Sequence, residues 1–336
     1  MEAMTSRERF FALAAGQPAD RPAVINPVSA ATTEAINEMK IDFPKVHTNA
    51  ETMAALAAYE YDVLGFDCIS PYFSVVVENA ALGATVDWGS NTNFPQHRST
   101  VFSEPDQIKI PSDYLDRPTT RSLLDAIKKL KAKYGGRALI IGKVMGPWTL
   151  CLHTYGVDDT LMATIDEREK LAAMTKALLE FGKYFAAAQL EAGADVITVA
   201  DHTTRNLVGP YVYRDFILPL HQEFNKAFPG KLILHCCGNT EDRVHYFSEA
   251  GFLVYHFESA NDIKKIISGA NGMPLTGCVN NPTTLYAGTP DDVYKETEMI
   301  LKEGIRILSP ECAVPLSVKN ENLKAITACA KNFKLN

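Results

Sequence analysis

From about residue 137 to the C-terminus, short apolar runs alternate with longer amphipathic stretches, and this alternation limits the possible folds more than any other feature. Such runs are typical of buried parallel strands. The stretches between them are typical of helices that cover a sheet. The expected strands are Ala138–Gly142, Ala194–Val199, Lys231–His235, Phe252–Phe257, Pro274–Gly277 and Ile305–Leu308. The expected helices are Arg168–Ala192, Tyr211–Phe228, Thr240–Ala250, Asn261–Ser268 and Pro290–Glu303. The pattern predicts an α/β protein built from repeated strand–helix units.

Two earlier apolar runs, Pro22–Asn26 and Gly65–Ser70, bring the number of expected strands to eight, which is the number that closes a parallel barrel. An open doubly wound sheet would show the same alternation. Such a sheet usually carries a glycine-rich phosphate loop after its first strand, and the sequence has neither G-x-G-x-x-G nor a P-loop. We therefore predict one (β/α)8 TIM-barrel domain over residues 1–336, with an N-terminal helical extension. The segment Tyr72–Asp116 is expected to be an irregular or short-stranded insertion after the second strand.

Composition excludes several classes of function. The net charge of −7, without a cluster of Lys and Arg, argues against nucleic acid as a partner. No run of eighteen apolar residues occurs and the first residues are charged, so we expect neither a membrane span nor a signal peptide, and a cytoplasmic protein. The seven cysteines are an odd, scattered set, which indicates reduced thiols. The sequence leaves the formation of a homodimer undecided, because it shows no apolar surface patch that would support one.

Metal-binding side chains follow several expected strands, where the loops of a barrel converge on one mouth. His235 and Cys237 end the fifth strand, and Cys312 follows the eighth. One imidazole and two thiolates suit zinc, and three protein ligands leave a fourth position open for water or substrate. In an extended turn, residues two apart can point to the same side, so Cys236 is expected to face away. The alternative is that these cysteines are small buried apolar residues.

Other polar side chains lie at the same strand ends. Glu258, after the sixth strand, is a candidate for a displaceable fourth ligand, or else a hydrogen-bond partner of a neighbouring loop. His153, His202 and His256 are further candidates, and hydrogen bonding within the rim is the favoured interpretation of each.

The sequence also resembles the uroporphyrinogen decarboxylase superfamily, and within it the branch of corrinoid-dependent methyltransferases. The resemblance runs along nearly the whole chain. It is carried by Thr5–Arg9, Asp20–Pro22, Ala80–Gly83, Gly146–Leu150, Ala192–Asp195, His235–Gly238, Gly277–Pro282 and Ser309–Cys312. The specific part is the His-x-Cys-Gly motif with a cysteine about 75 residues later, because this is the zinc pattern of the methyltransferase branch.

The resemblance implies an enzyme that moves a methyl group between a corrinoid and a small molecule, most simply a thiol acceptor such as coenzyme M. Zinc would deprotonate the thiol, whose pKa is otherwise about 8.5, and so make it a nucleophile. The incoming thiol would displace Glu258 or water from the metal, and Asp201 and Asn280 would orient the small substrate. The corrinoid is expected in trans on a partner protein, because the chain lacks Asp-x-His-x-x-Gly. The residues expected to contact this cofactor are Trp148, His202 and Asn281.

Three alternatives stay open beside this interpretation. An O-demethylase would take methyl from a methoxylated aromatic compound, and the residues that could line its donor pocket are Tyr72, Phe73, Trp148, Tyr155 and His202. Porphyrinogen decarboxylation is less favoured, because the arginine-rich stretch of the decarboxylases is missing after Arg21. A metal-stabilised binding module would have a closed site with four ligands.

Overall fold

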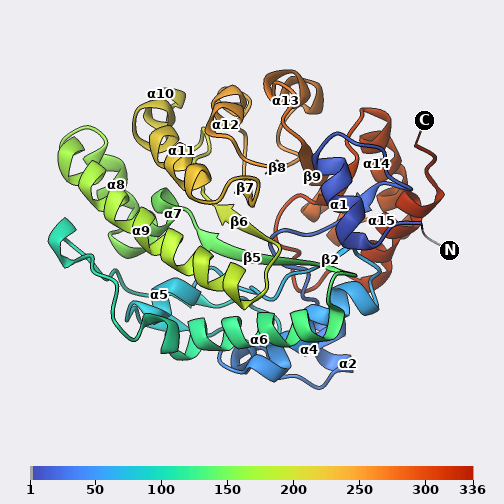
Figure 1. The fold of residues 1–336 in the computed structure, drawn as a ribbon, viewed down its shortest axis with the longest axis horizontal. Coiled ribbons are helices and arrows are strands. Elements are labelled where there is room, and N and C mark those ends of the chain that lie inside the picture. The colour runs from blue at the N-terminus through green and yellow to red at the C-terminus, as the bar shows by residue number, and fades with distance from the viewer. Residues whose placement is uncertain (1–2, 336) are drawn as a thin grey trace.

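A computed structural model describes residues 3–335, and its centre is an eight-stranded parallel sheet that curves into a nearly closed barrel (Figure 1). The order of strands around the sheet is β1-β10-β9-β8-β7-β6-β5-β2. Their bounds are β1 Ala23–Val24, β2 Cys68–Ile69, β5 Leu139–Met145, β6 Val196–Ala200, β7 Leu232–Cys236, β8 Val254–Phe257, β9 Leu275–Val279 and β10 Ile307–Pro310. Each strand overlaps one of the eight predicted runs, so the predicted TIM barrel is confirmed.

Asp67, directly before β2, joins the two strands at which the ring closes. Its backbone N–H donates to the Val24 carbonyl oxygen over 2.6 Å, and its carboxylate accepts from the Val24 N–H over 2.8 Å. The carboxylate also accepts from Arg9 Nη1 over 2.6 Å and from both terminal nitrogens of Arg21 over 2.8 and 2.9 Å. Asp67 and Arg9 are fully buried, so a desolvated ionic cluster closes the barrel.

The interior of the barrel is filled at its amino-terminal end. Side chains from seven of the strands and their flanks form a separate apolar cluster, and Phe10 of α1 (Ser6–Ala14) inserts into it. In Figure 1, α1 lies at one end of the sheet and the arrowheads of β5 and β6 point away from it. The predicted N-terminal helical extension therefore closes the amino-terminal end of the barrel. A ligand can enter at the other end, where the carboxyl ends of the strands lie.

Helices cover the outside of the sheet. Those around the first strands are α2 Thr33–Glu38, α3 Phe43–Val46, α4 Ala50–Asp62, α6 Pro118–Tyr134, α7 Pro147–Thr154, α8 Val157–Ala163 and α9 Arg168–Ala192. Those that follow are α10 Pro210–Val212, η3 Tyr213–Ile217, α11 Leu218–Ala227, α12 Val244–Ala250, α13 Ile263–Gly269, η4 Asn281–Tyr286, α14 Pro290–Lys302 and α15 Asn320–Asn332. None of the helices within residues 3–335 is both long and apolar enough to cross a membrane.

The helix expected over Tyr211–Phe228 is divided into α10, η3 and α11. Pro219, in the first turn of α11, has no N–H to donate to the preceding turn, so the regular hydrogen-bond pattern cannot run through it. The segment η3 just before it has the wider π-helical pattern. The predicted helical extent was therefore nearly right, but its continuity was wrong.

The predicted insertion has little regular structure, as expected. It contains α5 Val77–Ala81, an antiparallel pair formed by β3 Val86–Asp87 and β4 Gln96–His97, and the short helices η1 Pro105–Gln107 and η2 Tyr114–Asp116. The His97 ring lies 4.7 Å from the His153 ring of α7, measured between centroids. This contact brings the insertion to the carboxyl-terminal mouth of the barrel.

Candidate metal centre and the cavity beside it

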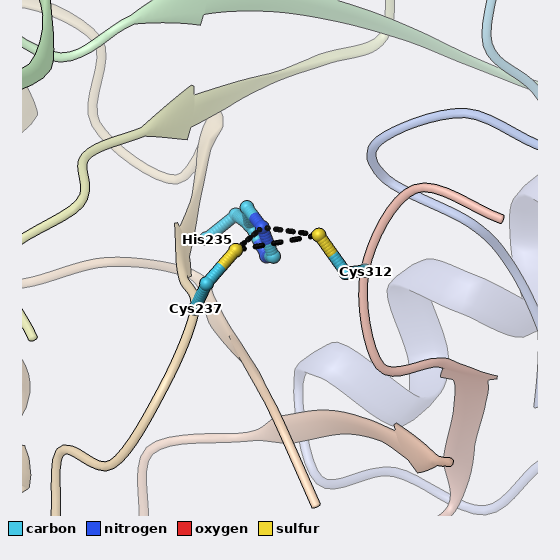
Figure 2. Close-up of side chains that lie close together, drawn as sticks. All are labelled: His235, Cys237 and Cys312. Carbon is cyan, nitrogen blue, oxygen red and sulfur yellow. Dashed lines mark hydrogen bonds between the residues drawn. The ribbon is translucent and has the colours of Figure 1, made fainter. Parts of the chain in front are cut away.

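The side chains of His235, Cys237 and Cys312 point toward one another at the mouth of the barrel (Figure 2). Cys237 Sγ lies 3.0 Å from His235 Nε2 and 3.3 Å from Cys312 Sγ, and Cys312 Sγ lies 3.5 Å from His235 Nε2. A disulfide requires about 2.05 Å between the sulfurs, so the two cysteines are free thiols in contact. Two segments about 75 residues apart in the chain thus supply one cluster of three donor atoms.

The end of β7 sets the directions of its cysteines. Cys236 is fully buried, and its sulfur lies 3.6 Å from Thr203 Oγ1, on the side away from the cluster. Gly238 then turns the chain with φ +75°, and a Cβ there would stand 2.4 Å from Thr204 Oγ1. Only glycine fits this turn, since a side chain would clash and φ is positive. The glycine of the His-x-Cys-Gly motif thus fixes the loop that carries Cys237.

Glu311 fixes the loop that carries Cys312. Its buried carboxylate accepts from the Ser259 N–H over 2.9 Å and from the Asn281 N–H over 2.8 Å. The loops after β8, β9 and β10 are therefore tied together beside the cluster. The carboxylate of Glu311 is thus engaged in holding these loops.

The two thiols share their protons unequally. The hydrogen bond with Cys237, and then the nearby His235, lower the pKa of Cys312. The same hydrogen bond, together with burial, raises the pKa of Cys237. Such a pair loses its first proton readily and its second with difficulty, unless a cation is present to stabilise two thiolates.

The cluster fits a tetrahedral metal ion such as zinc. With Zn–S of about 2.3 Å and Zn–N of about 2.0 Å, tetrahedral ligand atoms stand about 3.5 to 3.8 Å apart. The three observed separations, 3.0, 3.3 and 3.5 Å, are at or slightly below that range. Among the described residues, His235, Cys237 and Cys312 are the one group of three or more His, Cys, Asp or Glu that could hold a metal ion. Three donors leave one coordination position open, whereas a binding module with a structural metal would have four.

Glu258 lies beside this cluster without belonging to it. Its carboxylate accepts from the N–H of Gly238, the residue after Cys237, and burial raises its pKa. The structure thus places it as a support of the loop, and direct ligation would require the carboxylate to leave Gly238.

A cavity of about 360 Å³ opens in front of the cluster, a size suited to a small molecule. His235, Cys237 and Cys312 form part of its wall, and Val28, Val75, Met145, Leu152 and Val157 supply apolar surface. His153 and His202 also line it, and burial lowers the pKa of both imidazoles, that of His153 to about 4.

Asp201 lies in the wall of this cavity with its carboxylate already engaged. Oδ1 accepts from the Thr149 N–H over 2.7 Å, and Oδ2 lies 2.8 Å from His221 Nε2. The Tyr213 hydroxyl continues this chain, 2.9 Å from His221 Nδ1. Thr149 Oγ1 in turn accepts from the His202 N–H over 2.6 Å. Asp201 therefore holds the loop that carries His202.

The other residues predicted to bind substrate or corrinoid are placed differently. Within residues 3–335, the lining of this cavity does not include Trp148, Asn280 or Asn281. Trp148 is fully buried, Asn280 caps η4 by accepting from the Thr283 N–H over 2.7 Å, and Asn281 donates to the Ala313 carbonyl oxygen over 2.9 Å. Tyr72, Phe73 and Tyr155, considered for an aromatic donor pocket, are also outside the lining that the structure describes. His256 Nε2 donates to the Pro310 carbonyl oxygen over 2.8 Å, and the His256 ring packs against His235.

Sequence reasoning missed Lys143, which lines the cavity from the middle of β5. It directly follows the predicted strand Ala138–Gly142, and a charged residue next to a buried run was a usable signal.

Comparison with known proteins agrees with this architecture. The family model described as uroporphyrinogen decarboxylase (URO-D) matches residues 5–333. The chain belongs to this family. The methylcobamide:CoM methyltransferase MtbA of Methanosarcina acetivorans is 28% identical over 340 residues, covering 99% of this chain and 100% of the relative. A methylated-thiol–coenzyme M methyltransferase of Methanosarcina mazei is 28% identical over 330 residues, covering 97% of this chain and 89% of the relative.

Among solved structures, a methyltransferase from Methanosarcina mazei superimposes with a TM-score of 0.93 at 28% identity, covering 98% of each chain. The resemblance seen in the sequence is thereby confirmed, as is the prediction that the chain is an enzyme of the corrinoid-dependent methyltransferase class.

Proposed function

We propose that this protein transfers a methyl group from a corrinoid, carried by a partner protein, to a small thiol of the coenzyme M type, at a zinc ion held by His235, Cys237 and Cys312. Residues 1–336 would act as one methyltransferase domain. The observation that carries the proposal is the convergence of these three donor atoms, with one position open, on the wall of a cavity of about 360 Å³. The names of the relatives, which describe methylcobamide and coenzyme M as their substrates, support it.

Zinc bound by these donors would supply charge that keeps a thiol deprotonated at neutral pH. The protein supplies position and surroundings. Glu311 and Gly238 hold the loops that carry the two cysteines, and Leu152 and Val157 line the cavity with apolar surface that would reduce the contact of a bound thiol with water. A sulfur in such apolar surroundings is poorly solvated and so more nucleophilic.

Asp201 and Glu258 are proposed to act by positioning. Asp201 orients Thr149 and with it the His202 loop, because both of its oxygens are engaged within the protein. Glu258 steadies the turn after Cys237. Asn280 is proposed to have the same kind of role in the loop after β9, since its side chain donates to Ser259 Oγ over 2.7 Å.

Mixing the zinc-loaded protein with methylcobalamin and a panel of compounds tests the proposal. We expect thiols to remove the methyl group, and the change in cobalt oxidation state to be visible in the absorbance spectrum. Methoxylated aromatic compounds with reduced cobalamin should leave the spectrum unchanged; methylation of cobalamin by them would identify an O-demethylase instead. Inertness toward all compounds in the panel would contradict the proposal.

A further inference from the structure

Lys143 is a buried cation that forms no ion pair with any residue the structure describes. Only 2% of the residue is exposed, and every residue of β5 around it is buried as well. Its Nζ donates to the Val28 carbonyl oxygen over 3.3 Å and lies 4.3 Å from the centre of the Tyr72 ring. Within residues 3–335, no carboxylate forms an ion pair with it. An ammonium group has three donors, so two of the three have no acceptor among the described residues.

The nearest acid does not meet this need. Glu78 acts on Lys143 through its charge, but one of its oxygens accepts from the Met145 N–H over 2.7 Å and the other from the Tyr72 hydroxyl. Burial raises the pKa of Glu78 to about 7, so its negative charge is incomplete at neutral pH. Burial lowers the pKa of Lys143 to about 8, which still leaves most of it charged at pH 7.

An uncompensated buried ammonium destabilises a fold, because it has lost its water without gaining an anion. Lys143 lies where a bound anionic ligand could balance its positive charge. It lines the same cavity as the three metal-binding residues, and the sulfurs of Cys237 and Cys312 are close enough for their charges to act on it. The other buried charge of this wall, Asp201, is bound by Thr149 and His221 and is therefore partly offset.

We propose that Lys143 is an anion-binding residue, which holds the acidic group of a small methyl acceptor while the thiol end of that acceptor lies at His235, Cys237 and Cys312. This inference rests on the proposed function for the identity of the reacting end, but the anion site itself does not depend on methyl transfer. What it adds to the proposed acceptor is a residue that determines specificity: a thiol whose chain carries a sulfonate or carboxylate would bind more tightly than a neutral thiol. The apolar side chains between the two ends would then contact the carbon chain of the acceptor.

The variant Lys143→Met tests this assignment, because it removes the charge and keeps an unbranched side chain. A hydrogen bond to a charged group contributes about 1.5 to 3 kcal/mol, which corresponds to a roughly 10- to 150-fold change in affinity. We expect ethanesulfonate and propanoate, measured by calorimetry with the zinc-loaded protein, to bind the variant at least tenfold more weakly. The KM for 2-mercaptoethanesulfonate should rise by a similar factor with little change in kcat, whereas the KM for 2-mercaptoethanol should stay the same.

Lys183→Met is the matched control, because Lys183 is a partly buried lysine of α9 that already pairs with Glu180 and Glu223. It should leave both KM values unchanged. Equal binding of ethanesulfonate and propanoate by the wild type and Lys143→Met would overturn the proposal. So would an equal loss of both thiols together with a loss of zinc, because Lys143 would then only balance the charge of the metal-binding thiols. If Lys143→Met does not fold, Lys143→Gln is measured in the same way.

The outcomes also separate this inference from the proposed function. A wild-type protein that binds the two acids through Lys143, but transfers no methyl group, retains the anion site and refutes the methyltransferase proposal. A protein that methylates both thiols equally well, with and without Lys143, would refute the anion site and retain the methyltransferase proposal.

Discussion

A Cys237→Ala variant is expected to lose bound zinc and methyl transfer together. Cys237 Sγ is the atom nearest to both other donors, at 3.0 Å from His235 Nε2 and 3.3 Å from Cys312 Sγ. Changing a residue that merely supports a metal ligand typically costs about 10- to 100-fold in affinity or activity, so loss of a ligand should exceed about 100-fold. Metal content by mass spectrometry and the rate of methylcobalamin demethylation by a thiol measure the two effects.

Cys236→Ala is the control for this experiment, because it removes the same side chain one position away. The Cys236 sulfur faces Thr203, and burial raises the pKa of this thiol to about 12, so it is protonated and apart from the cluster. Its removal should leave zinc content and rate within about threefold of the wild type, with a modest loss of stability from the small cavity. Full activity in metal-free Cys237→Ala would refute the assignment of the centre.

An Asp67→Ala variant should lose a large part of the stability of the barrel. The carboxylate is fully buried and accepts hydrogen bonds from Arg9, Arg21 and the Val24 N–H at the closure of the ring. Its removal would leave the positive charges of Arg9 and Arg21 without this partner in the interior. Breaking a buried ionic cluster in this way costs about 3 to 5 kcal/mol. Urea denaturation, followed by circular dichroism, measures the shift in the unfolding midpoint.

The control is Asp87→Ala, which breaks an exposed ion pair with Arg98. Such surface pairs contribute about 0 to 1 kcal/mol, so its midpoint should hardly move. Equal midpoints for Asp67→Ala and Asp87→Ala would show that the barrel does not depend on this cluster. Insoluble Asp67→Ala, beside soluble Asp87→Ala, would agree with the expected direction.

The barrel was predictable from the sequence because nearly all strand residues are buried, so the strands appear as short and mostly apolar runs. Several helix ends were predictable from glycines that follow the amphipathic stretches. Gly193, Gly251 and Gly304 have φ angles of +118°, +85° and +103°, which glycine adopts easily. The break in the helix at Pro219 was missed, although a proline inside a helical stretch is a visible signal.

The candidate site was predictable only in part. A barrel brings the carboxyl ends of its strands together. A cluster was therefore expected from the three residues at these ends, His235, Cys237 and Cys312. The direction of a polar side chain in a loop is set by its hydrogen-bond partners, which the sequence does not reveal. Asn280, Asn281 and Glu258 therefore looked like groups that face a substrate.

Glu258 and Asn281 bond to backbone groups of neighbouring loops, whereas Asn280 caps the helix that follows it and donates to Ser259 Oγ. Trp148 was misplaced for a related reason: it begins α7 near the cavity, but its ring packs into the core. Position along a strand or helix thus predicts which end of the barrel a residue is near, but not what its side chain touches.

X-ray absorption at the zinc edge tests the central claim most directly. The account predicts two sulfur ligands in the zinc-loaded protein and three after saturation with 2-mercaptoethanesulfonate, because the substrate thiol would take the open position beside Cys237 and Cys312. A sulfur count that stays at two, under conditions in which the thiol is methylated, would contradict it.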